Sequence, residues 1–429
     1  MQRKILSDLI EWKNSRNRMP LLLNGARQVG KTYILDEFGR ENYENVVHIN
    51  FENNNLVSNY INEDITPKRI IEYIETTEKQ QIKPEKTLLF FDEIQANERA
   101  LTSLKYFCEN APEYHIVAAG SLLGVAVNRE KYSFPVGKVN ELTLYPLDFE
   151  EFLWALDRKK LAEKIREHFE TNREFPLHSL ALEYYRKYLV IGGMPAVVKN
   201  YVETESFLQT NTYQADIYNE YIADMAKYSK PATSVKIRAC YNSIPAQLAK
   251  ENHKFQYKMV QKGGTATIFG ESIEWLNFAG IVLKCQKITH GEIPIAVYSY
   301  FPDFKLYMAD VGMFTLKSQI PASMLLSENN EANTFLGAFV ENYVAQAFAA
   351  NKKSLFYWRN DNSGEVDFVL QEDINVIPVE VKRGTNTRSR SLIMFMRQYR
   401  CPYAIRISQK NFGFENDIKS VPLYAVFCI

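Results

Sequence analysis

An eight-residue stretch near the N-terminus has the residue types and spacing of a phosphate-binding loop. It follows the apolar run Leu21–Leu23 and consists of Gly25, Ala26, Arg27, Gln28, Val29, Gly30, Lys31 and Thr32. The two glycines allow the backbone to curl so that successive N–H groups point at one anion. The helix expected after the loop adds partial positive charge, Lys31 can reach the β- and γ-phosphates, and the Thr32 hydroxyl can ligate Mg²⁺. The stretch therefore predicts binding of a nucleoside triphosphate with Mg²⁺.

Two carboxylates follow the apolar run Leu88–Phe91, which is typical of a buried parallel strand. Asp92, at the tip of that strand, can hold the Mg²⁺ of the predicted loop. Glu93 is placed to orient and deprotonate an attacking water. The run Ile116–Ala119 leads to Ser121, which could contact the γ-phosphate or that water, although serine after glycine is also ordinary turn chemistry. Together these residues predict hydrolysis of the bound nucleotide.

A second group of charged residues lies near the C-terminus. Glu380 and Lys382 occupy alternate positions of an expected strand and so share one face, while Asp367 ends the preceding strand of the same expected hairpin. Asp367 and Glu380 could share Mg²⁺ or Mn²⁺, with Lys382 stabilising developing negative charge. Glu341, on the helix expected over Phe335–Ala349, is a candidate third carboxylate. Alternate charges are also typical of the solvated face of a half-buried hairpin, and that alternative stays open.

Positive charge is concentrated in one segment of the chain. Residues 382 to 410 include eight basic residues and no acidic ones: Lys382, Arg383, Arg388, Arg390, Arg397, Arg400, Arg406 and Lys410. Such a run can contact phosphates, so we expect the C-terminal region to engage DNA. We expect the same of the winged-helix-like module predicted over residues 229–326. A basic surface that pairs with acidic patches elsewhere on the protein is the alternative.

The chemistry-bearing residues require at least two α/β domains to position them. Over residues 1–150, short apolar runs alternate with helical stretches, as in βαβ units, and we expect a five-stranded parallel P-loop domain there. The runs expected to form its strands are Leu21–Leu23, Val46–Phe51, Leu88–Phe91, Ile116–Ala119 and Val139–Leu144. Residues 151–228 are expected to form a helical lid, whose helices are interrupted by a turn at Gly192, Gly193, Met194 and Pro195. Residues 229–326 are expected to form a winged-helix-like module, with strand-like pieces such as Ile295–Tyr298. A polar stretch begins at Ser327, and residues 327–429 return to an α/β pattern.

Four segments carry a resemblance to a known family: NGARQVGKT, LLFFDEIQ, AAGSLLG and LTLYPLDFEEFLW. They resemble a group of predicted bacterial and archaeal ATPases in the AAA+-like branch, and the segment YLVIGGMPAVV extends the resemblance over nearly the whole chain. The resemblance implies a strand inserted between the phosphate-loop strand and the Asp-Glu strand, ATP rather than GTP, and Glu93 as catalytic base. Relatives commonly carry Gly-Arg where this chain has Gly137 and Lys138. Because lysine lacks the bidentate fork of arginine, a finger-like role for Lys138 is doubtful.

The C-terminal segments are similar to the restriction-endonuclease-like PD-(D/E)xK fold. The resemblance maps the helix glutamate to Glu341, the hairpin aspartate to Asp367, and the E-x-K strand to Glu380 and Lys382. It implies a nuclease-like domain over residues 327–429, and an intact fold of this kind does not by itself establish cleavage.

Composition excludes several classes of protein. Lys+Arg and Asp+Glu number 51 each, so any attraction to nucleic acid must be local. The five cysteines are odd in number and lack CxxC spacing, which argues against zinc sites and disulfides and predicts a cytoplasmic protein. No apolar run is long enough for a membrane span.

The sequence therefore predicts an ATP-hydrolysing switch or motor joined to a DNA-binding, metal-dependent nuclease-like domain. One alternative is a nucleotide-gated regulator of the STAND type, whose C-terminal domain only binds a partner. Another is a kinase or small-molecule ligase, which would need an acceptor pocket. A homo-oligomer is expected if a neighbouring subunit supplies a catalytic finger.

Overall fold

The computed structural model describes residues 1–120, 135–227, 229–250, 253–327, 335–360, 364–384 and 390–429. The chain divides into two compact units. One consists of Arg3–Tyr145 with Phe278–Gly280, and the other of Met1–Gln2, Pro146–Asn277 and Ile281–Ile429. Each unit is described by itself below.

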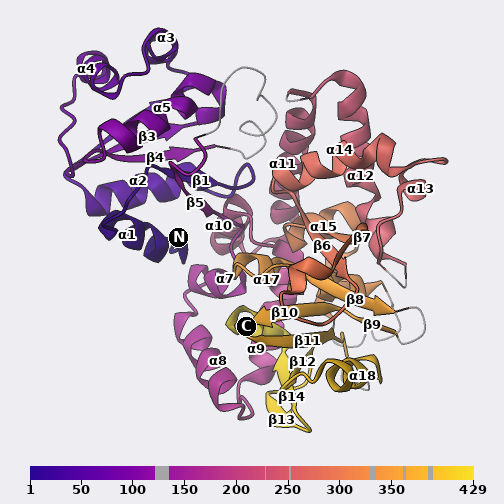
Figure 1. The fold of residues 1–429 in the computed structure, drawn as a ribbon. Coiled ribbons are helices and arrows are strands. Elements are labelled where there is room, and N and C mark those ends of the chain that lie inside the picture. Colours follow the sequence, from indigo (N-terminus) through magenta and orange to yellow (C-terminus); the bar gives the residue numbers. More distant parts are fainter. Residues whose placement is uncertain (121–134, 228, 251–252, 328–334, 361–363, 385–389) are drawn as a thin grey trace. The chain divides into compact units, whose positions relative to one another are not determined.

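The first unit is built on a five-stranded sheet with the order β2-β3-β4-β1-β5, in which all neighbours run parallel (Figure 1). The strands are β1 (Leu21–Asn24), β2 (Asn45–Asn50), β3 (Thr87–Asp92), β4 (His115–Ala119) and β5 (Asn140–Thr143). All five fall on the apolar runs from which strands were predicted. The predicted insertion of one strand between the phosphate-loop strand and the Asp-Glu strand is confirmed, because β4 lies between β1 and β3.

Helices connect these parallel strands, as parallel pairing requires. They are α2 (Lys31–Asn42), α3 (Asn55–Glu63), α4 (Pro67–Glu78), the short 3-10 helix η1 (Ile94–Ala96) and α5 (Glu98–Asn110), and α1 (Ile5–Asn14) precedes the first strand. The interior strand β3, between β2 and β4, is buried along its whole length. Its apolar run is continuous rather than alternating because both faces of the sheet are covered, which brings Asp92 to the carboxyl edge of a rigid core.

The second unit begins with a helical region, as predicted. Its helices are α7 (Phe149–Ala155), α8 (Lys159–Thr171), α9 (His178–Ile191), α10 (Pro195–Thr204), α11 (Phe207–Lys227), α12 (Pro231–Leu248), α13 (Tyr257–Val260) and α14 (Ala266–Phe278). The predicted break between α9 and α10 is confirmed, and close backbone packing explains it. A Cβ on Gly193 would lie 1.9 Å from Leu147 O, and Gly193 N donates a 2.6 Å hydrogen bond to Asp310 Oδ2.

A four-stranded sheet with the order β7-β6-β8-β9 joins segments that are distant in the sequence. It consists of β6 (Val282–Ile288), β7 (Ser299–Met308), β8 (Phe356–Asn360) and β9 (Gly364–Val366). The sheet thus crosses the predicted domain boundary at residue 326, while the limits of the predicted domains stay predictions. The strand expected over Ile295–Tyr298 is wrong: this segment forms the 3-10 helix η2 directly after Pro294, and β7 starts only at Ser299.

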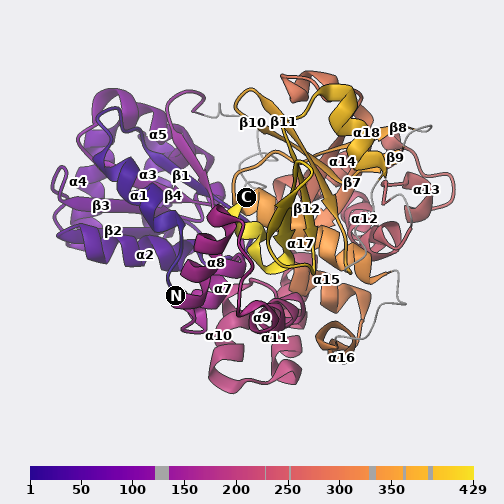
Figure 2. The same ribbon diagram turned by 90° about the horizontal axis from the view of Figure 1, so that it is seen from below.

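A second five-stranded sheet has the order β10-β11-β12-β14-β13. The strands are β10 (Phe368–Glu372), β11 (Asn375–Val381), β12 (Ala404–Ser408), β13 (Gly413–Glu415) and β14 (Ile418–Pro422), and the helices of this part are α15 (Val311–Ser318), α16 (Ala322–Leu326), α17 (Leu336–Ala350), α18 (Arg390–Tyr399) and the 3-10 helix η3 (Leu423–Cys428). The strands β11, β12 and β14 pair in parallel, whereas β10 and β13 pair antiparallel at the edges. Figure 2 labels β10, β11 and β12 of this sheet. The region is α/β as predicted; its assignment to the restriction-endonuclease-like fold remains a prediction.

No helix in the described part of the chain is long and apolar enough to cross a membrane.

Candidate functional site

The loop between β1 and α2 has the backbone conformation that a phosphate cradle needs. Gly25 has φ 152°, Gln28 has φ 66° and Gly30 has φ 91°, so the chain curls through conformations that favour glycine at both ends. A Cβ on Gly25 would lie 2.4 Å from Leu144 O, which leaves no room for a side chain. At both ends of the loop, the backbone conformation therefore favours the glycine that the sequence has there.

The Lys31 ammonium lies within this curl. Lys31 Nζ donates hydrogen bonds of 2.9 Å to the carbonyl oxygens of Gly25 and Ala26. The outer side of the loop is fixed by Arg3, whose Nη1 donates a 3.1 Å bond to Val29 O. A cation is thus held at the mouth of a ring of backbone groups, where it can meet an anionic ligand.

The structure brings Thr32 and Asp92 together from positions far apart in the sequence. Thr32 Oγ1 donates a 2.9 Å hydrogen bond to Asp92 Oδ2. The same carboxylate oxygen lies 3.3 Å from His48 Nε2, and His48 Nδ1 lies 3.6 Å from Asp36 Oδ1. Burial acts to lower the pKa of His48, but the hydrogen bond with Asp92 and the charge of Asp36 outweigh burial and raise that pKa.

Sequence reasoning missed His48, although its strand contains a signal. The residues of β2 pair in register with β3, and His48 is the partner of Phe90, on which its ring stacks with centroids 4.2 Å apart. His48 lies two positions before Asn50 on the same strand, and Asn50 is the register partner of Asp92. Because alternate residues of a strand share a face, His48 lies on the same face of the sheet as Asn50 and Asp92. A polar residue there could have been singled out once the pairing of the two strands was known.

Glu93 is held by a neighbour that the sequence analysis also passed over. Glu93 has φ 49°, and its Oε2 accepts a hydrogen bond from Gln95 Nε2. Gln95 Oε1 is buried, has no hydrogen-bond partner among the described residues, and would lie 2.6 Å from a Cβ on Gly120. Gln95 therefore fills the space between Glu93 and the end of β4.

Two other predicted positions have different outcomes. Ser121 lies outside the described residues. Lys138 Nζ lies 3.0 Å from Glu109 Oε1, so its ammonium is occupied by a local ion pair.

In the second unit, a cavity of about 840 Å³ brings together Asp367, Glu380 and Lys382. Its other lining residues are Ala249, Lys250, Arg359, Asn360, Gly364, Glu365 and Ser391. Asp367 is the single residue between β9 and β10, and so it precedes a strand of the hairpin instead of ending one. It lies where the chain passes from the four-stranded to the five-stranded sheet, opposite the Glu380 end of β11.

The two carboxylates in this cavity are crowded and incompletely neutralised. Glu380 Oε1 lies 2.5 Å from Lys382 Nζ, while its buried Oε2 has no hydrogen-bond partner among the described residues. Asp367 Oδ2 accepts a 2.7 Å bond from Val381 N. Burial, together with the charge of Glu380, raises the pKa of Asp367 well above its ordinary value. Glu380 has an oxygen without a hydrogen-bond partner, and its charge repels that of the Asp367 carboxylate. Both features fit a cation that is bound by this pair of carboxylates and has water as its other ligands.

Glu341 does not line this cavity; its oxygens are occupied elsewhere. Lys305 Nζ lies 2.7 Å from Glu341 Oε1 and 2.6 Å from Glu365 Oε1, and His253 Nδ1 lies 2.5 Å from Glu341 Oε2. The Tyr307 hydroxyl also donates to Glu341. Burial acts to raise the pKa of Glu341, but Lys305 and His253 outweigh it and hold that pKa well below its ordinary value. In the described part of the chain, no three acidic, His or Cys residues form a group that could hold a metal.

Comparison with known families adds to this geometry. Residues 17–153 match a family model described as an AAA domain. Residues 182–324 and residues 336–426 match models of two domains of unknown function, DUF8612 and DUF4143. No curated protein matches the chain. The N-terminal match, the parallel sheet and the glycine-bounded loop define an AAA-type P-loop ATPase-like domain.

Several solved structures share part of the backbone course. A Walker-type ATPase of Pyrococcus abyssi has 16% identity and a TM-score of 0.45, over 74% of this chain and 96% of that chain. The Orc1 protein of Aeropyrum pernix, in complex with DNA, has 12% identity and a TM-score of 0.30, over 76% and 93%. A STAND protein of Pyrococcus horikoshii with a tetratricopeptide repeat sensor has 12% identity and a TM-score of 0.28, over 82% and 45%.

Proposed function

We propose that the protein hydrolyses ATP in the presence of Mg²⁺ at the site formed by Gly25–Thr32, Asp92 and Glu93. The observation that carries this proposal is the 2.9 Å hydrogen bond between Thr32 Oγ1 and Asp92 Oδ2. It joins a hydroxyl at the start of α2 to a carboxylate at the tip of β3, which are oxygen ligands of the kind that Mg²⁺ takes. The match of residues 17–153 to an AAA domain supports the same assignment.

The residues of the site divide the work of hydrolysis among them. The backbone of the loop and the Lys31 ammonium bind the phosphates, for which Lys31 must exchange its bonds to Gly25 O and Ala26 O. Thr32 and Asp92 would hold Mg²⁺, which when bound neutralises phosphate charge. Glu93 takes the proton of the attacking water. Because Gln95 donates to the Glu93 carboxylate in this structure, that hydrogen bond must lengthen or be shared when the water binds.

Phosphate release by the purified protein tests this proposal. Lys31→Ala is expected to abolish turnover and nucleotide binding together, whereas Glu93→Gln is expected to abolish turnover and leave binding of a fluorescent ATP analogue intact. Lys68→Ala, which changes an exposed lysine of the same unit, is the matched control and should leave both unchanged. Turnover by Glu93→Gln at the wild-type rate would show that Glu93 is not the catalytic base. Conversion of ATP to ADP with transfer of the phosphoryl group to a small molecule, and without release of inorganic phosphate, would favour a kinase or ligase.

We further propose that the C-terminal region engages DNA and cuts it with Mg²⁺ or Mn²⁺ at Asp367 and Glu380. The cavity that joins these carboxylates to Lys382 favours this function. Asp367 and Glu380 would hold the metal ion, which when bound activates a water. Lys382 would stabilise charge on the phosphate. Burial acts to lower the pKa of Lys382, but Glu380 and Asp367 raise it, so the ammonium remains charged.

One observation favours the alternative of a nucleotide-gated regulator. The buried Lys305 ammonium already neutralises Glu341 and Glu365, so fewer carboxylates remain for a metal than the family pattern implies. In that case the C-terminal region would bind a partner without cutting it, and ATP turnover would control when the partner is bound.

Cleavage of DNA by the full chain distinguishes the two. Mn²⁺-dependent nicking that Glu380→Gln removes while ATP turnover persists would support the nuclease. Absence of cleavage by the wild type with Mg²⁺ and with Mn²⁺ would exclude it and leave the ATPase proposal standing.

A further inference from the structure

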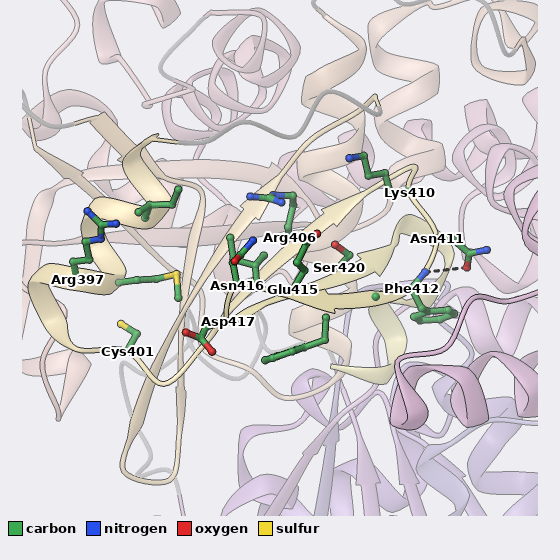
Figure 3. Close-up of a pocket in the computed structure, with 15 residues that line it drawn as sticks. Arg397, Cys401, Arg406, Lys410, Asn411, Phe412, Glu415, Asn416, Asp417 and Ser420 are labelled. Atoms are coloured by element: carbon green, nitrogen blue, oxygen red, sulfur yellow. Dashed lines mark hydrogen bonds between the residues drawn. The ribbon is translucent and has the colours of Figure 1, made fainter.

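A second hollow of the C-terminal region shares no lining residue with the Asp367–Glu380 cavity. It is a groove of about 720 Å³ whose walls come from α18, β12 and the hairpin of β13 and β14 (Figure 3). Three cations line it: Arg397 from α18, Arg406 from β12, and Lys410, two residues after the end of β12. We call this hollow the β12 groove.

The three cations are incompletely neutralised in the described part of the protein: the charge of Glu380 acts on Arg406 from the neighbouring strand, but no close ion pair joins them. Neither Arg397, Arg406 nor Lys410 forms a hydrogen bond or close ion pair through its side chain with a described residue. Arg406 is half-buried, and its Nε is fully buried with no partner. Burial lowers the pKa of Arg406, which reports the cost of holding this charge away from water. A bound anion would offset that cost, and a guanidinium favours anions with two oxygens, such as phosphates.

Strand register relates this charge to the neighbouring cavity. Glu380, Arg406 and Ser420 are partners across β11, β12 and β14, so they form a row on one face of the sheet. Adjacent strands lie about 4.8 Å apart. A phosphate on Arg406 would therefore lie one strand from Glu380, and a chain of phosphates could continue from the β12 groove toward the carboxylates.

The groove also has an apolar contact surface and an acidic rim. Phe414 lines it and is 53% exposed, so one face of its ring is open to a ligand in the groove. Glu415 and Asp417, from the same hairpin, are exposed and face the groove without a described partner. Cations on one side and an exposed aromatic ring on the other are the combination that binds single-stranded nucleic acid, with phosphates on the former and a base on the latter.

We propose that the β12 groove binds a single strand of nucleic acid, with phosphates on Arg397, Arg406 and Lys410 and a base stacked on Phe414. This inference rests on the proposed engagement of DNA by the C-terminal region, and it adds the place and the strandedness. Duplex DNA keeps its bases paired and stacked, so it would leave Phe414 uncovered. The acidic rim would repel the strand from the hairpin side and direct its phosphates toward β12.

Fluorescence anisotropy of a labelled thymidine oligonucleotide with the full chain tests the proposal. Arg406→Gln should weaken binding about tenfold and reduce the slope of log affinity against log salt by about 1. Phe414→Ala should also weaken binding about tenfold but leave that slope unchanged. Glu415→Gln should tighten binding. Arg400→Gln, an exposed arginine absent from the groove lining, is the matched control, and thermal unfolding followed by circular dichroism checks that each variant is folded.

The outcomes separate this inference from the proposed function. Equal weakening by Arg400→Gln and Arg406→Gln would show diffuse attraction to a basic surface and overturn the groove. Binding of duplex DNA but not of the thymidine oligonucleotide would also overturn it, while leaving the engagement of DNA in place. If the protein bound neither the thymidine oligonucleotide nor duplex DNA, both the β12 groove and the proposed engagement of DNA would be contradicted.

Discussion

The buried ammonium of Lys305 lies 2.7 Å from Glu341 Oε1, although the two residues belong to segments that match two different family models. Lys305 is on β7 and has no exposed side-chain surface, and Glu341 is on α17. The sheet formed by β7, β6, β8 and β9 joins the same two segments through backbone hydrogen bonds. The C-terminal carboxylates are therefore positioned in part by residues on the other side of the predicted domain boundary at residue 326.

Lys305→Met should destabilise the protein strongly, because it leaves Glu341 and Glu365 buried with less compensating charge. We expect a loss of about 3–5 kcal/mol in the free energy of unfolding. Urea denaturation followed by circular dichroism measures it.

The double variant Lys305→Met with Glu341→Gln provides the control. Removing both charges should recover a large part of the lost stability. If the double variant were as unstable as the two single losses added together, the ion pair would not be the source of the effect.

Gly25→Ala should impair nucleotide binding before it impairs folding of the sheet. A Cβ there would lie 2.4 Å from Leu144 O, so the loop must move and its N–H groups lose their common direction. We expect ATP affinity to fall about tenfold or more, measured by titration with a fluorescent analogue. Gly137→Ala is the matched control: Gly137 also has positive φ, but a Cβ there meets nothing within 4 Å. Unchanged affinity in Gly25→Ala would contradict the cradle.

Thr32→Val should raise the Mg²⁺ concentration needed for half-maximal ATP turnover, because it removes the hydroxyl that lies 2.9 Å from Asp92 Oδ2. The expected increase is about tenfold or more. Thr32→Ser keeps the hydroxyl and should retain the wild-type requirement. If both variants needed the same Mg²⁺ concentration for half-maximal ATP turnover, the Thr32 hydroxyl would not be a ligand of the metal.

Asp310 should make stability depend on pH. Burial raises its pKa from 3.8 to about 6, against the hydrogen bonds that it accepts from Gly193 and Met313. The folded state therefore binds more protons than the unfolded state between these values, and stability should fall as pH rises from about 4 to about 6. Asp310→Asn should be less stable, since its amide cannot accept from both backbone N–H groups, but this pH dependence should be reduced. Thermal unfolding at several pH values measures both effects.

Specific ATPase activity should rise with protein concentration if a neighbouring subunit supplies the finger. The ammonium of Lys138 is paired with Glu109, which motivates this expectation. Phosphate release over a dilution series checks it. A constant specific activity would indicate a self-contained monomer.

Local chemistry explains which parts could be predicted from the sequence. The five parallel strands correspond to contiguous apolar runs, and the phosphate loop corresponds to two glycines that its backbone conformation requires. Each could therefore be located in the sequence to within a residue or two. The pairing of Thr32 with Asp92 also followed, because the carboxyl ends of parallel strands share one edge of a sheet. The strand expected over Ile295–Tyr298 failed since a short apolar run after a proline does not specify extended structure.

Partnerships across the fold were not predictable in the same way. His48 beside Asp92, Gln95 on Glu93 and Lys305 on Glu341 each depend on which strands and helices become neighbours. The sequence by itself determined a nucleotide loop, its acidic strand and the carboxylates around residue 380, because their residue types and spacing are local. Only the tertiary structure decided that Glu341 is neutralised by a buried lysine and that Arg406 lies on the strand next to Glu380 with its Nε buried and without a hydrogen-bond partner. Charges acquire partners through folding, and a linear spacing does not contain those distances.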